Sequence, residues 1–145
     1  MKIHFGQISI EPGVTFPFSL LFQRRLSDEV TALVAPSATF SQRYGDDWAL
    51  IFRVSAKRII GENEIRGPSV FRKSKDVEFT IFLPFDAIQH EESVARSAVA
   101  FLLRGVCSVL GSLGFNTSEI QARQSSLVES ISSDPAMFKT MARNA

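Results

Sequence analysis

The chain is poor in the residues from which most catalytic and metal sites are built. Its 145 residues include one cysteine and two histidines, and they contain neither a Cys-x-x-Cys nor a His-x-x-x-His pair for zinc. They also contain no Gly-rich phosphate loop and no Gly-x-Ser-x-Gly nucleophile elbow. We therefore expect no metal, no cofactor and no enzyme activity.

Scarce cysteine and short apolar runs also bear on the compartment. The single Cys107 cannot form an internal disulfide, which suits a reducing environment, and its apolar neighbours predict a buried, unreactive thiol. No N-terminal segment has the pattern of a signal peptide. The longest apolar-rich run, Val94 to Leu113, carries Arg96 and Arg104, so it indicates a buried helix rather than a membrane span. We expect a cytoplasmic protein with no membrane partner.

Neither sign of charge dominates the chain. Sixteen basic and fifteen acidic residues give a net charge of +1 at pH 7, so no global field favours nucleic acid. No nucleic-acid partner is therefore expected. Acid pairs such as Asp46–Asp47 and Glu62–Glu64 are typical of solvent-facing turns, although carboxylates that are distant in sequence can still meet in space.

The first 85 residues have the alternation of strands. Apolar residues recur at every second position in several short runs, and the chain's 13 phenylalanines are mostly expected in the core. Gaps of turn length between the runs favour an antiparallel, meander-like sheet of five to six strands over residues 1–85. The expected strands are Ile3–Gln7, Val14–Phe22, Glu29–Ala35, Trp48–Val54, Ile65–Arg72 and Val77–Leu83.

The last 60 residues change to a helical period. From Ala95 to Leu113 apolar residues recur at three- and four-residue steps, which predicts a long helix over about 88–113 that packs on the sheet. Shorter C-terminal helices follow: one is expected to begin at Asn116 or Thr117, and a last turn at Asp134-Pro135. The sequence thus predicts a single α+β domain over residues 1–145.

Two polar segments carry the residue types that dominate protein interfaces. The first lies in the polar stretch 37–47, next to Trp48, which we expect to be buried. The second is a charged turn that suits either a soluble sheet edge or docking to an acidic protein surface. The candidate partner-binding residues are Arg43, Tyr44, Asp46, Asp47, Arg72, Lys73 and Lys75.

The passage from the strand Val77–Phe85 into the helix Ala95–Leu113, in a small Phe-rich α+β chain, resembles bacterial immunity proteins of polymorphic or contact-dependent growth-inhibition toxin systems. The resemblance covers most of the chain in outline and includes no family motif, so it carries over no individual contact residue. It implies a non-catalytic inhibitor that occludes the active site, or an adjacent surface, of a cognate protein toxin encoded by a neighbouring gene. The mild basicity departs from the acidic balance of nuclease inhibitors, which implies an acidic or mixed toxin surface.

Two other functions fit the same sequence. A ligand-binding or hydrolytic domain would have a pocket between sheet and helix, lined by some of the phenylalanines. A secretion chaperone or adaptor would associate through an apolar edge or helix face. The sequence leaves open whether the chain is a monomer or a homodimer.

Overall fold

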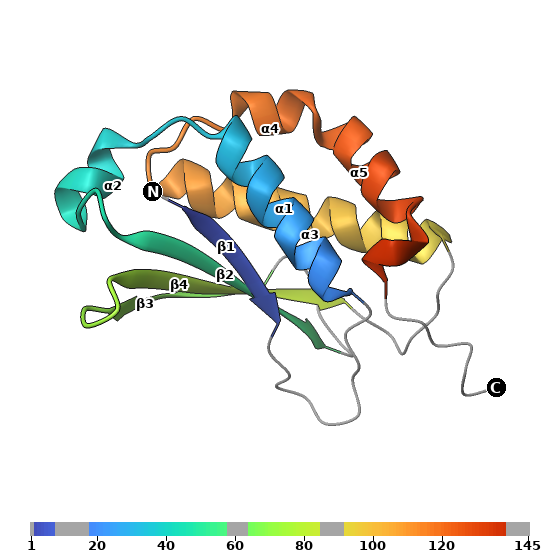
Figure 1. Ribbon diagram of the computed structural model, residues 1–145, viewed down its shortest axis with the longest axis horizontal. Coiled ribbons are helices and arrows are strands. Elements are labelled where there is room, and N and C mark those ends of the chain that lie inside the picture. The colour runs from blue at the N-terminus through green and yellow to red at the C-terminus, as the bar shows by residue number, and fades with distance from the viewer. Residues whose placement is uncertain (1, 8–17, 58–63, 85–91, 139–145) are drawn as a thin grey trace.

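The computed structural model describes residues 2–7, 18–57, 64–84 and 92–138. These residues form an α+β structure in which helices cover one face of a sheet (Figure 1). The elements are β1 (Ile3–Gln7), α1 (Leu20–Leu33), α2 (Ala38–Arg43), β2 (Ala49–Lys57), β3 (Glu64–Phe71), β4 (Asp76–Pro84), α3 (Glu92–Ser112), α4 (Ser118–Ala122), α5 (Gln124–Ser132) and the 3-10 turn η1 (Pro135–Met137).

The sheet of the described residues has four strands in the order β1-β2-β4-β3. β1 and β2 are parallel, β2 and β4 are parallel, and only β3 and β4 are antiparallel. The expected antiparallel meander of five to six strands is therefore wrong. The helices α1 and α2 lie between β1 and β2 in the chain. Parallel neighbouring strands require a long crossover connection of this kind, and a tight turn cannot join them.

The error arises in the segment that contains α1. The predicted strand at 29–35 is helical as far as Leu33, and the predicted strand at 14–22 lies partly outside the described residues and partly in the same helix. The buried apolar side chains of α1 are Phe22, Leu26 and Val30, which are spaced by four and so lie on one helical face.

The polar stretch 37–47 also contains a helix that sequence reasoning missed. The buried Ser37 hydroxyl accepts a hydrogen bond from the Phe40 N–H (3.1 Å) and donates one to the Leu113 carbonyl (2.9 Å). The first bond caps α2 and the second ties it to the end of α3. Ser37 thereby fixes the start of α2 beside the end of α3.

The predicted C-terminal helices are present. The long helix expected over about 88–113 is α3, and residues 88–91 of that prediction lie outside the described residues. The helix expected from Asn116 or Thr117 is two short ones, α4 and α5, and η1 follows Asp134.

The core lies between the sheet and the helices. The parallel register places Leu50 beside Val77 and Phe52 beside Phe79, so their side chains share the helix-covered face. A larger set of fully buried side chains comes from both layers: Leu50, Phe52, Val77, Ile81, Leu83, Val99, Leu102, Leu103, Val106 and Leu110. These buried side chains form the core between the sheet and α3.

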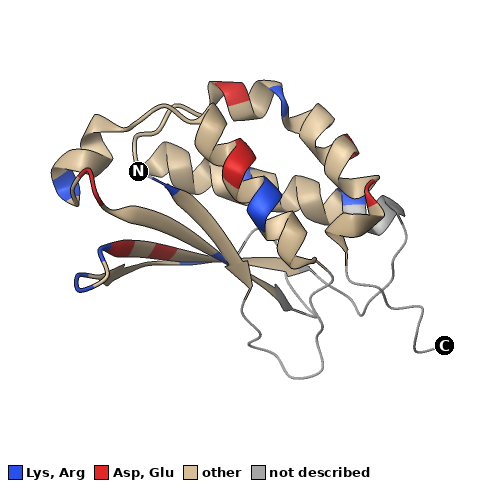
Figure 2. Ribbon diagram, viewed as in Figure 1, with Lys and Arg blue, Asp and Glu red and all other residues tan. Residues whose placement is uncertain are grey.

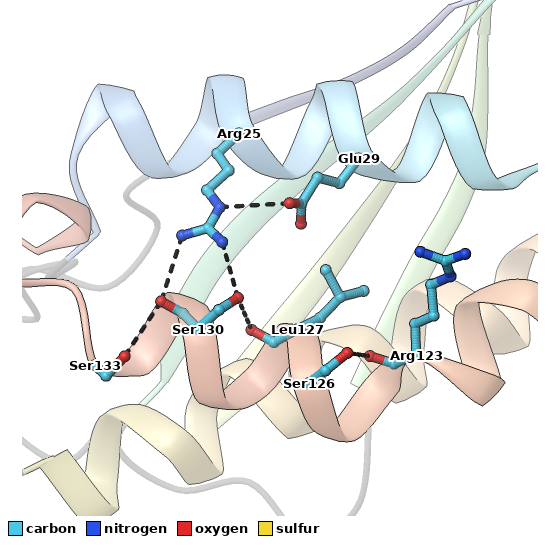
Figure 3. Close-up of polar contacts among 7 residues, drawn as sticks. All are labelled: Arg25, Glu29, Arg123, Ser126, Leu127, Ser130 and Ser133. Carbon is cyan, nitrogen blue, oxygen red and sulfur yellow. Dashed lines mark hydrogen bonds and ion pairs between the residues drawn. The ribbon is translucent and has the colours of Figure 1, made fainter.

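A polar clamp holds α1 against α5 outside this core (Figure 3). The Arg25 guanidinium points from α1 to Ser130, where it donates hydrogen bonds to the hydroxyl (2.8 Å) and the carbonyl (3.4 Å). The same guanidinium lies 3.6 Å from a Glu29 carboxylate oxygen one turn further along α1. The clamp orients the two helices, whereas their stability comes chiefly from buried apolar surface.

The Ser19 cap of α1 gives a first stability prediction. Its hydroxyl accepts from the Phe22 N–H (3.2 Å) and donates to the Ala136 carbonyl (2.7 Å), so it joins the start of α1 to η1. We expect Ser19→Ala to lower the free energy of unfolding by about 1–2 kcal/mol in urea denaturation. Ser126→Ala, which removes an exposed serine inside α5, is the control and should change it by less than about 0.5 kcal/mol. Equal losses in the two variants would contradict the capping role.

Candidate functional site

The fold brings the two predicted interface segments together at one end of the molecule, which we name the tip surface. It comprises Arg43, Tyr44, Asp46 and Asp47 from the connection between α2 and β2, and Arg72, Lys73 and Lys75 from the turn between β3 and β4. Both segments lie at the same end of the sheet (Figure 1). The Ala49 N–H donates to the Lys75 carbonyl (2.9 Å), and the Lys75 ammonium forms an ion pair with the Asp47 carboxylate. The two segments therefore form one continuous surface.

Aromatic rings support the α2 side of this surface. Successive ring centroids are 5.4 Å apart for Phe115 and Phe40, 4.9 Å for Phe40 and Tyr44, and 5.5 Å for Tyr44 and Trp48. Trp48 is only 8% exposed, as the sequence predicted, while Tyr44 is half-buried between Phe40 and Trp48. Tilted ring contacts on both sides hold the Tyr44 ring in place.

Gly45 keeps the loop close to these rings. Its φ of +137° disfavours any side chain, and a Cβ there would lie 3.0 Å from Trp48 Cδ1. The loop can therefore follow the tryptophan closely, which orients Asp46 and Asp47 at the surface.

Cations outnumber anions among the unpaired groups of the tip surface. Arg43, Arg72 and Lys73 are exposed and have no ion-pair partner among the described residues, although the Arg43 guanidinium lies 5.5 Å from the Tyr44 ring centroid. On the acidic side, Asp46 is exposed and Asp76, at the start of β4, is half-buried. Figure 2 shows the basic turn of the hairpin next to the acidic stretch of β4. The outermost part of the surface is positive.

Two apolar residues at this end, Val70 and Phe71, were not among the predicted partner-binding residues. Val70 is 40% and Phe71 46% exposed, and both precede the basic turn on β3, the edge strand of the sheet. By contrast, eight of the chain's other phenylalanines are buried: Phe5, Phe18, Phe22, Phe40, Phe52, Phe79, Phe82 and Phe115. The signal that could have identified Phe71 is its place at the end of an interrupted strand, directly before four polar residues. An exposed phenylalanine beside cations adds an apolar anchor to the surface.

The ion pair within the tip surface gives a second prediction. The hydrogen bond from Lys75 holds the pKa of the Asp47 carboxyl below its ordinary value of 3.8. A lowered pKa in the folded state means that the pair stabilises the fold above the unfolded-state pKa and that this contribution disappears as the pH falls through the folded-state pKa. We expect Lys75→Met to return the Asp47 pKa toward 3.8 in a carboxyl NMR titration, while Lys73→Met leaves it unchanged. An Asp47 pKa that is indifferent to Lys75 would contradict the pairing.

The other titratable residues of the described segments do not form a metal site. They contain no cluster of three or more His, Cys, Asp or Glu side chains able to hold a metal ion. The Glu78 carboxylate is bonded to Arg53 at 2.9 Å on the helix-free face, and Glu62 lies outside the described residues. Cys107 is half-buried, and burial raises the pKa of its thiol, which lowers its reactivity at neutral pH.

Comparison with models of protein families, with curated proteins and with solved structures found no match to this chain. Of the helices in the described segments, none has the length and apolar content needed to cross a bilayer.

Proposed function

We propose that this chain is a non-catalytic protein-binding protein that contacts its partner through the tip surface. One observation carries this proposal. The two segments selected from the sequence, because they contain residue types common in protein interfaces, are distant in sequence, and the contact between Asp47 and Lys75 joins them into one surface. Arginine, tyrosine and other aromatic residues supply most of the binding energy of protein interfaces.

The surface is preorganised for binding. The hydrogen bond from Ala49 to Lys75 fixes the turn between β3 and β4, and the aromatic row fixes Tyr44. Ordering mobile side chains and loops on association costs affinity, and a surface that is already ordered avoids much of that cost. Tyr44 and Phe71 then supply apolar anchors within a polar rim.

The charge of the surface favours an acidic partner. Arg72 and Lys73 are exposed in the turn and have no ion-pair partner in the part of the chain that the structure describes, and exposed cations of this kind accelerate encounter with a negative surface. This agrees with the acidic or mixed toxin surface that the immunity-protein resemblance implies.

The specific form of the proposal is an immunity-type inhibitor acting in the cytoplasm. The chain would bind a cognate toxin, encoded by a neighbouring gene, and occlude its active site or a surface beside it. Such a mechanism needs shape and charge complementarity and no catalytic group on the inhibitor. It is supported by the residue types of the tip surface and by the α+β architecture that the resemblance implies.

The test is affinity purification of the tagged chain from its native cells, followed by expression of the recovered partner alone and together with the chain. We expect a stoichiometric partner that arrests growth alone and is harmless when the chain is present. An Arg72→Glu/Lys73→Glu variant should fail to recover the partner, whereas Arg123→Glu, an equally exposed arginine beyond α4, should recover it. A partner that is harmless alone would overturn the toxin assignment, and recovery by the double variant would overturn the use of the tip surface.

A further inference from the structure

β1 lies at the opposite edge of the sheet from β3, and its outer edge pairs with no other strand among the described residues. β1 is the first strand in the order β1-β2-β4-β3, so only one of its two edges pairs with another described strand. An unpaired strand edge is a template for an added strand. This edge is separate from the tip surface, and the inference does not depend on the proposed function.

The register identifies which backbone groups face outward. The Leu50 N–H donates to the Lys2 carbonyl (3.2 Å), and Ile3 is the parallel partner of Leu50. Along a parallel strand the backbone groups point alternately to one neighbour and to the other. Because the Lys2 carbonyl bonds to β2, the N–H and C=O groups of His4 and Gly6 also point to β2. The N–H and C=O groups of the alternate residues, Ile3, Phe5 and Gln7, therefore point away from the sheet.

Helix α1 covers only the first of these outward residues. The Thr31 hydroxyl accepts from the Ile3 N–H (3.3 Å), and the Ser27 hydroxyl donates to the Ile3 carbonyl. No described group bonds to the backbone N–H and C=O of Phe5 and Gln7. The edge is thus closed at Ile3 and available from Phe5 onward.

A groove of about 400 Å³ lies between α1 and the first part of β1, and it reaches the available edge at Phe5. Lys2 and Phe5 of the β1 segment form one wall, and Leu20, Arg24 and Asp28 of α1 line the other. The three helix residues are spaced by four and so form one stripe along α1. Leu20 is 70% exposed, so an apolar side chain stands at the open end.

We propose that this groove binds an extended, acidic segment of a partner protein, which adds to β1 as a further strand. The backbone groups of Phe5 and Gln7 would hydrogen-bond to the segment, as in other complexes formed by strand addition. Alternate side chains of the segment then face the groove, where Leu20 contacts an apolar one. Lys2 and Arg24 outnumber Asp28 among the charged lining residues, so the groove selects a carboxylate.

The test uses a phage-displayed library of random octapeptides selected on the full chain. We expect enriched peptides that alternate β-branched and polar residues and carry at least one Asp or Glu. Arg24→Glu should weaken the best peptide at least tenfold, while Arg123→Glu should not. Hydrogen exchange followed by NMR should slow at the Phe5 amide when the peptide binds and stay unchanged at Gly6, whose amide already faces β2.

Three results would overturn the proposal. The first is a selection that enriches no peptide, or only peptides without an acidic residue. The second is a peptide that protects amides elsewhere and leaves the Phe5 amide unchanged. Finally, a dimer that protects Phe5 without any peptide would assign the edge to a second copy of the chain.

Discussion

Replacing Phe52 by alanine should cost about 3–5 kcal/mol of the free energy of unfolding, the largest loss expected from a single substitution in this chain. The Phe52 side chain is fully buried, and its ring centroid lies 5.2 Å from that of Phe5 and 6.4 Å from that of Phe79. These residues come from three adjacent strands, so the truncation opens a cavity across the middle of the sheet. Domains of this size are stable by only about 5–15 kcal/mol, so this loss removes a large share of the total stability and should lower the urea midpoint clearly.

Ile51→Ala is the matched control for this prediction. Ile51 is the neighbour of Phe52 in β2, but it lies on the helix-free face and is only partly buried. Urea denaturation should place its loss below about 2 kcal/mol. If the two variants lost equal stability, the helix-covered face would not be the principal core.

Sequence patterns identified β2 and β4 because each has an unbroken alternation with one buried face. Leu50, Phe52 and Val54 face the helices, and their partners Val77, Phe79 and Ile81 do the same. The same reasoning identified α3, whose apolar residues keep a helical spacing over its whole length. Long and strongly periodic segments are those in which local pattern and tertiary environment agree.

The prediction failed around α1 because two periods overlap there. Phe18, Leu20 and Phe22 continue an alternation, while Phe22, Leu26 and Val30 form a helical stripe. Ser19 is the residue that decides between them, since its hydroxyl caps the helix. Reading the α1 segment as two strands places both of them between β1 and β2 in a meander, whereas β1 and β2 are direct parallel neighbours, so one local error changed the whole sheet topology.

The candidate site was predicted in its parts and not as a whole. Residue type and loop position selected Arg43, Tyr44 and the basic turn from the sequence. The two segments meet because β4 pairs with β2, which places Ala49 beside Asp76. The meander that the sequence favoured would have placed β3 between these two strands. Asp47 and Lys75 are 28 positions apart in the sequence, and a local sequence pattern does not predict contacts between residues so far apart.

Reversing the charge of the basic turn should have the largest effect on binding. We expect Arg72→Glu/Lys73→Glu to weaken the affinity for the partner recovered with this chain by about 100-fold, which corresponds to about 2.8 kcal/mol. Both side chains are exposed and unpaired among the described residues, so the substitutions place like charges against an acidic surface without disturbing the fold. Thermal unfolding of the variant should match that of the wild type.

The kinetics separate a contact at the tip surface from a general loss of charge. Most of the change should appear as slower association that depends on salt, because rim charges act mainly on encounter. Arg123→Glu makes the corresponding single change outside the tip surface, and Arg123 already faces Glu119 at 3.4 Å, so it should leave the association rate unchanged. Surface plasmon resonance at two salt concentrations measures both rates. If Arg123→Glu slowed association equally, net charge and not the tip surface would control the encounter. If the double variant bound unchanged, the interface would lie elsewhere on the protein.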